Sequence, residues 1–162
     1  MNTFNKISAL LASTALLAAC STVKLDGSHQ QVKTVDVTNG IGAAGVPAPA
    51  ARSVYFDVDS YTVRADGQSV VSAHSEFLNK NRGQKIIIQG NTDDRGTAEY
   101  NLALGQRRSE ALRQALALRG VGATQMEAVS LGKEKPKAMG SGEAAWAENR
   151  RVEIGYQQGA PR

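Results

Sequence analysis

The stretch from Ile86 to Leu118 constrains the fold of this chain more than any other feature. It has the pattern of a strand, a short turn and a helix. The stretch opens with the β-branched run 86–88, which indicates a buried strand. A polar, acidic turn follows, and from about Thr97 the composition is typical of a helix. The helical pattern ends at Gly120, where a glycine suits a left-handed cap. The pattern therefore predicts a β-turn-α unit at the centre of the fold.

An arginine falls on the apolar side of this helix. At about 100° per residue, Leu104 and Leu112 share one face, and Arg108 lies within that face together with Asn101. The neighbouring Arg107 points elsewhere. A guanidinium directed at a core needs partners, because removing one member of a buried ion pair costs about 3–5 kcal/mol.

The acids nearest to Arg108 in the sequence are Asp93 and Asp94, in the turn before the helix. A carboxylate at that turn, the guanidinium and the free N–H groups of the helix start would meet in one small space. Such a set suits a ligand that carries both an ammonium and a carboxylate. An equally good interpretation is a purely structural salt bridge between Arg108 and Asp93.

The beginning of the chain has a targeting pattern. Residues 1–19 contain one early cation, Lys6, and then an apolar run that is shorter than the roughly 20 residues needed to span a bilayer. The run ends in Leu-Ala-Ala-Cys, which resembles the bacterial lipobox, whose cysteine is acylated. Cys20 is the only cysteine, so no intramolecular disulfide can form. Ser21 replaces the aspartate that favours inner-membrane retention. We therefore predict a lipid at Cys20 and an outer-membrane location, with the domain facing the periplasm.

The remaining sequence predicts a flexible linker over 20–52, one small domain over 53–156 and a disordered tail over 157–162. Within the domain the predicted order is β-α-β-α-β-(α)-β. This order indicates a two-layer α/β (α+β) sandwich with its helices on one face and parallel pairing between strands joined by a helix. The predicted strands cover 54–56, 86–88, 126–130 and 151–156; the predicted helices run to about 79, from 97 to 119 and from 143 to 148.

Composition and spacing exclude several classes of function. A net charge of +4 without a long basic run, and an aromatic content of 5%, argue against a nucleic-acid partner. His29 and His74 have no neighbouring ligand residues, so we expect neither a metal nor another cofactor. No nucleophile stands beside a base, so we expect no enzyme. A peptidoglycan hydrolase that uses Asp93 and Asp94 is the alternative from a different class.

Motifs spread over the predicted domain resemble the OmpA-like C-terminal domain family. They are Val54–Asp59, Gly90–Asp93, Gly96, Asn101, Leu104, Arg107-Arg108 and Asn149–Val152. The stretches 94–101 and 131–136, taken with the lipobox, are similar to the lipid-anchored members of that family that act with the Tol proteins. Two residues depart from the family pattern: Asn91 stands where histidine is usual, and Ser109 where alanine is usual. Both replacements are conservative, so we expect the pocket to persist with altered affinity or pH response.

This resemblance implies non-covalent binding of the peptidoglycan stem peptide at its meso-diaminopimelate residue. It further implies an outer membrane tethered to the wall, a role in division, and TolB and other Tol proteins as partners. An OmpA-like lipoprotein outside the Tol system is the alternative within the family. Carried over by position, Asp93 and Arg108 hold the two charged groups of diaminopimelate, and the rest of the pocket is lined by Asp59, Arg95, Asn101 and Leu104.

Overall fold

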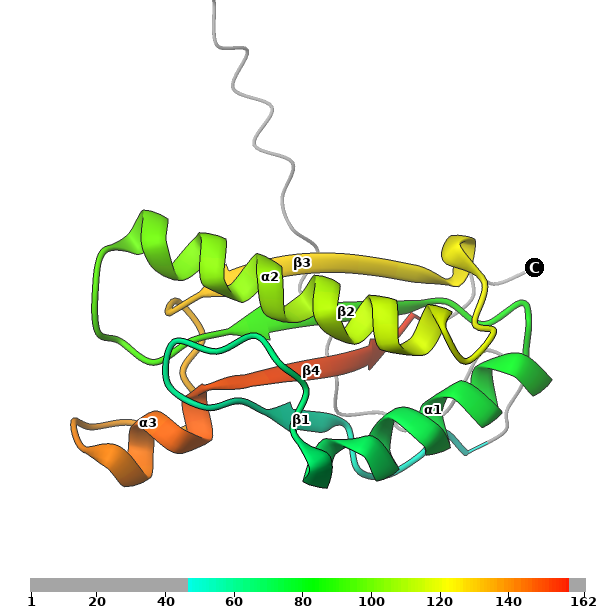
Figure 1. Ribbon diagram of the computed structural model, residues 1–162, viewed down its shortest axis with the longest axis horizontal. Helices are drawn as coiled ribbons and strands as arrows, with labels where there is room; N and C mark the ends of the chain where they lie inside the picture. Colours follow the sequence, from blue (N-terminus) through cyan, green and yellow to red (C-terminus); the bar gives the residue numbers. More distant parts are fainter. Residues whose placement is uncertain (1–46, 158–162) are drawn as a thin grey trace, which may run out of the picture. The chain divides into compact units, whose positions relative to one another are not determined.

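The computed structural model describes residues 47–157, which form a four-stranded sheet with two long helices on one of its faces (Figure 1). The strands are β1 (Ser53–Tyr55), β2 (Ile86–Asn91), β3 (Met126–Gly132) and β4 (Arg151–Tyr156). The helices are α1 (Gln68–Lys80), α2 (Ala98–Ala117) and the short α3 (Glu143–Asn149), with 3₁₀ turns η1 (Ala65–Gly67) and η2 (Ala123–Gln125). The predicted α/β sandwich is confirmed. The predicted signal peptide, Cys20, most of the linker and residues 158–162 lie outside the described residues.

The order of strands in the sheet is β1-β4-β2-β3. Strands β2 and β3 are parallel, as predicted for strands joined by a helix, whereas β4 is antiparallel to both of its neighbours. The predicted parallel pairings of β1 with β2 and of β3 with β4 are wrong, because β4 lies between β1 and β2 and pairs with both of them. Burial explains this arrangement: Val152 and Ile154 of β4 are fully buried, which suits a central strand, while the three-residue β1 suits an edge.

The hydrophobic core fills the space between the sheet and the helices. The sheet contributes Ile86 and Ile88, whose alternation places both on the same face of β2. The helices contribute residues at helical spacing, among them Leu112 and Leu116 of α2. Full burial of each such side chain stabilises the fold by about 1.5–3 kcal/mol. Core packing therefore fixes which face of α2 meets the sheet.

Two glycines bring the backbone of α2 against β2. A Cβ atom added to Gly90 would lie 1.9 Å from the carbonyl oxygen of Gly105, and one added to Gly105 would lie 2.9 Å from the carbonyl oxygen of Gly90. Only residues without a side chain permit this contact. Because Arg108 follows Gly105 by one helical turn on the same face, the contact places the guanidinium over the end of β2.

The residues just before β1 pack onto the domain. Ala48 contacts the core, and the carbonyl of Arg52 accepts a hydrogen bond from the N–H of Ile154 at 2.9 Å. His74 is fully buried between the Tyr156 hydroxyl (Nδ1, 2.6 Å) and the carbonyl of Ala51 (Nε2, 2.8 Å). Burial lowers the pKa of this histidine, so it serves as a neutral core residue. The packed part of the chain thus begins before the predicted boundary at residue 53.

Candidate functional site

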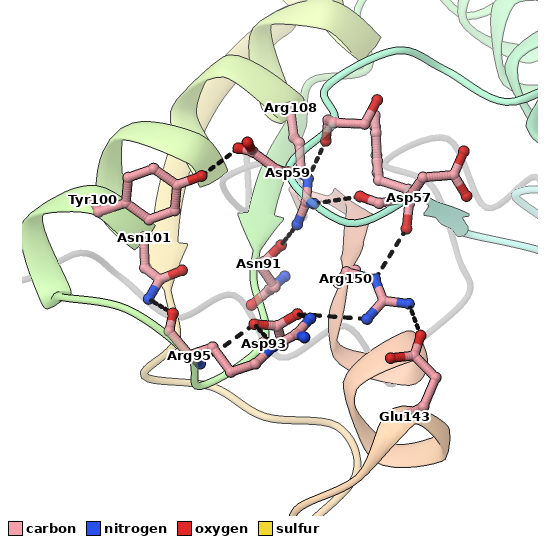
Figure 2. Close-up of polar contacts among 12 residues, drawn as sticks. Asp57, Asp59, Asn91, Asp93, Arg95, Tyr100, Asn101, Arg108, Glu143 and Arg150 are labelled. Atoms are coloured by element: carbon pink, nitrogen blue, oxygen red, sulfur yellow. Dashed lines mark hydrogen bonds and ion pairs between the residues drawn. The ribbon is translucent and has the colours of Figure 1, made fainter.

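A cavity of about 250 Å³ opens between the segment after β1, the turn after β2 and the first turns of α2. Figure 2 shows the polar side chains that converge there. All of the site residues predicted from sequence line this cavity: Asp59, Asp93, Arg95, Asn101, Leu104 and Arg108. The remaining lining residues are Val58, Thr92, Gly96 and Tyr100.

Arg108 is the largest fully buried side chain of the described residues. Its guanidinium donates from Nε to the carbonyl of Ser60 (2.8 Å), from Nη1 to that of Asn91 (3.0 Å) and from Nη2 to that of Asp57 (3.0 Å). The proposed structural salt bridge with Asp93 is not formed among the described residues. Burial lowers the pKa of Arg108 to about 10, opposed by the Asp93 charge, so the side chain stays cationic at neutral pH. These three bonds engage three of its five N–H groups.

Asp93 supplies a negative charge to the cavity and is paired with two arginines. The guanidinium of Arg95 donates to it twice, from Nη2 to Oδ2 at 2.6 Å and from Nε to Oδ1 at 3.2 Å. Arg150 lies on the other side, with Nη1 3.4 Å from Oδ2. Burial acts to raise the pKa of Asp93, but the hydrogen bonds from Arg95 and Arg150 outweigh it and lower that pKa. The carboxylate is therefore ionised at neutral pH.

Arg150 is a site residue that the sequence analysis placed in a motif but did not propose for the pocket. It is buried and donates to Oε1 of Glu143 at 2.5 Å and to the carbonyl of Phe56 at 3.3 Å, besides contacting Asp93. The double arginine before the last strand was the only signal in the sequence. Arg150 and Asp93 lie 57 residues apart in the sequence, so their pairing cannot be inferred without knowledge of the fold.

The rim of the cavity joins the segment after β1 to α2. The hydroxyl of Tyr100 donates a hydrogen bond to the Asp59 carboxylate, and this bond raises the pKa of Tyr100. Asp59 has φ +53°, the single non-glycine residue with positive φ within residues 47–157. Such backbone conformations are uncommon and concentrate at functional sites. Leu104 is 7% exposed and gives the cavity an apolar wall.

The turn that carries Asp93 and Arg95 is held from two sides. Asn101 donates to the carbonyl of Arg95 at 2.7 Å, which explains why this amide lies on the inner face of α2. Lys133, just after β3, donates to the carbonyl of Gly96 at 3.0 Å. These bonds fix the backbone of the turn, so the charged groups are positioned before any ligand arrives.

The two departures from the family pattern lie behind the cavity. Asn91 and Ser109 are buried, and neither lines the cavity. Asn91 takes part through its backbone carbonyl, which accepts from Arg108, while its side chain donates to the carbonyl of Gln89 at 3.2 Å. Ser109 donates to the carbonyl of Gln106 at 2.9 Å. The cavity therefore keeps its lining with both replacements in place.

Residues 47–157 contain neither a helix that is long and apolar enough to cross a membrane nor a cluster of three or more His, Cys, Asp and Glu side chains that could hold a metal.

The chain is similar in sequence to one family of proteins and to relatives that share one name. Residues 55–150 match the OmpA family. A peptidoglycan-associated lipoprotein of Pasteurella multocida (strain Pm70) is 39% identical over 158 residues, covering 96% of this chain and all of that protein. A protein of the same name from Pseudomonas aeruginosa is 38% identical over 162 residues, covering 93% of this chain and 96% of that one.

Solved structures agree with these relatives. The crystal structure of the peptidoglycan-associated lipoprotein from Burkholderia pseudomallei has 60% sequence identity and a TM-score of 0.66, covering 67% of this chain and 92% of that one. The C-terminal domain of Helicobacter pylori MotB has a TM-score of 0.63 at 22% identity, covering 68% of this chain and 88% of that one. This second likeness concerns the fold alone.

Proposed function

Because this chain belongs to the OmpA family, we propose that it is an outer-membrane lipoprotein that binds peptidoglycan non-covalently and so ties the outer membrane to the cell wall. One observation carries the proposal: an anionic Asp93 and a cationic Arg108 line the same small cavity. The peptidoglycan-associated lipoproteins that resemble the chain over nearly its full length support it.

The ligand that fits this pair is the free end of meso-diaminopimelate, where one carbon bears an ammonium and a carboxylate. Asp93 accepts the ammonium, and the two remaining N–H groups of Arg108 donate to the carboxylate. The methylene chain lies against Leu104. A volume of about 250 Å³ is below the range of about 300–1,000 Å³ typical of drug-sized ligands, so it suits one amino-acid end rather than a sugar pair.

The arrangement favours binding over hydrolysis. Asp94, the second carboxylate of the hydrolase alternative, is exposed and is not part of the cavity lining. Asp93 is held between arginines, which keep it charged and acceptor-only rather than poised for proton transfer. A binding protein should sediment with purified sacculi and release no soluble muropeptides, whereas a hydrolase should release them.

We assign the chain to the Tol–Pal system, with TolB and other Tol proteins as partners and a role in envelope integrity and in constriction during division. The resemblance of residues 94–101 and 131–136 to the family members that act with the Tol proteins supports this proposal. The alternative is an OmpA-like lipoprotein that acts outside that system. Retention of TolB on the immobilised chain in a pull-down separates the two.

A competition assay tests the pocket. Stem peptides of the diaminopimelate type and the lysine type compete at fixed ionic strength for binding of the chain to sacculi. Loss of two charge-assisted hydrogen bonds predicts that the lysine type competes about a hundredfold less well. Asp93→Ala should abolish sedimentation with sacculi, while the exposed Arg107→Ala serves as the control. Equal competition by the two peptides would rule out this mechanism.

A further inference from the structure

The carboxylate of Asp93 already accepts four hydrogen bonds within the protein. Its Oδ1 accepts from the backbone N–H of Arg95 at 3.3 Å and from Nε of Arg95 at 3.2 Å. Its Oδ2 accepts from Nη2 of Arg95 at 2.6 Å and from Nη1 of Arg150 at 3.4 Å. A carboxylate offers about four lone-pair positions. An incoming ammonium therefore has to displace one of these donors.

The two arginines differ in how firmly they are held (Figure 2). The side chain of Arg150 is 7% exposed and is tied to Glu143 as well as to the carbonyl of Phe56. The side chain of Arg95 is 41% exposed and lines the cavity. Arg150 makes the longer contact with Asp93, but its burial and its other partners hold it in place. The half-exposed Arg95 is therefore the donor that is freer to move.

The Arg95 side chain has a second contact besides Asp93. Its guanidinium carbon lies 4.2 Å from the centroid of the Trp146 ring, a cation–π contact that does not require Asp93. The backbone around it is fixed by Asn101, which donates to the Arg95 carbonyl at 2.7 Å. Release from Asp93 thus needs a rotation of the side chain alone, and the guanidinium stays at the edge of the cavity.

We propose that Arg95 is a specificity-determining residue that exchanges partners when the ligand binds. In the free protein it occupies the place of the ligand's ammonium on Asp93. In the complex it leaves Asp93 and pairs with the carboxylate of the same ligand end, beside Arg108. The inference rests on the proposed function and deepens it, because it explains how the site rejects simple amines.

The exchange favours ligands with both charges over ligands with one. A diaminopimelate end gives Asp93 a new cation and gives Arg95 a new anion, so no charged group is left without a partner. A lysine end supplies the cation only and leaves Arg95 with no carboxylate. Discrimination then comes from a penalty on the wrong ligand as well as from contacts to the right one.

The test compares full-length wild type with Arg95→Gln, which removes the charge and keeps most of the length. Binding of L-Ala-γ-D-Glu-meso-diaminopimelate and of L-Ala-γ-D-Glu-L-Lys is measured by titration calorimetry. Removing a half-exposed competing ion pair should tighten binding of the lysine peptide by about fivefold. Binding of the diaminopimelate peptide should weaken, so the ratio of the two affinities falls by about tenfold or more. Arg107→Gln, exposed on α2, is the matched control and should leave both affinities unchanged.

The possible outcomes are distinct. Weakening of both peptides by the same factor would make Arg95 an ordinary contact residue and overturn the exchange. Unchanged affinities would overturn it as well. Failure of the wild type to bind either peptide contradicts the proposed function itself, and with it the inference. Arg95→Lys separates charge from shape: it restores a cation for Asp93 and should restore part of the preference against the lysine peptide.

Discussion

Arg108 combines two roles in a single side chain. Its guanidinium donates to backbone carbonyls of Asp57 and Ser60 after β1 and of Asn91 at the end of β2. It therefore stabilises the loop and the strand end that form the cavity, and it also contributes a positive charge to the cavity. Arg108 is thus a structural residue as well as a predicted binding residue.

Replacing Arg108 by methionine should lower the free energy of unfolding by about 3 kcal/mol or more, because three carbonyls lose their charged donor. Urea denaturation measures the change. Arg107→Met, exposed one position earlier on α2, should stay within about 0.5 kcal/mol of the wild type. The idea fails if the two variants are equally stable.

The sequence predicted which arginine faces inward but not what that arginine contacts. Helical periodicity alone separates Arg108 from Arg107, since one position changes the direction by about 100°. Two of its three acceptors lie 48 and 51 residues earlier, in a segment whose path depends on the whole fold. The expected partner, Asp93, instead pairs with Arg95 and Arg150.

At the scale of elements, the sequence predicted the positions of helices and strands better than it predicted which strands pair. The start of α2 follows from capping, because Thr97 accepts from the N–H of Tyr100. The helix ends at Ala117, two residues before the predicted end, and Gly120 in the turn after it has φ +89°. The position of β4 between β1 and β2 could not be predicted, because it depends on which distant strands bury each other's faces.

The contact between α2 and β2 gives an element-scale prediction. Gly90→Ala would put a methyl group 1.9 Å from the Gly105 carbonyl oxygen, so the helix has to move away from the strand. We expect a loss of about 1–3 kcal/mol in unfolding free energy, typical of overpacking, together with weaker sedimentation with sacculi because Arg108 moves with α2.

Gly83→Ala is the matched control for that variant. No atom lies within 4 Å of its added Cβ, so stability and sedimentation should both match the wild type. Urea denaturation and sacculus sedimentation are measured on all three proteins. A Gly90 variant with unchanged stability and binding would show that α2 does not depend on this contact.

At the scale of the whole molecule, the proposed function needs two attachments that lie far apart in the sequence. Cys20 carries the predicted lipid and lies outside the described residues, whereas the cavity is built from residues 58–108 within the domain. Each attachment should therefore be removable without disturbing the other.

Cys20→Ser tests this independence at the membrane end. Acylation requires the thiol, so the variant should disappear from the outer-membrane fraction and appear among soluble periplasmic proteins. Its domain should remain folded and should sediment with sacculi as the wild type does, because Asp93 and Arg108 are untouched.

Asp93→Ala is the reciprocal variant: it should stay in the membrane fraction and should no longer sediment with sacculi. Expressed beside the wild type, soluble Cys20→Ser should also occupy wall sites and weaken the tether in proportion to its amount. Retention of Cys20→Ser in the outer-membrane fraction would contradict the predicted lipid anchor.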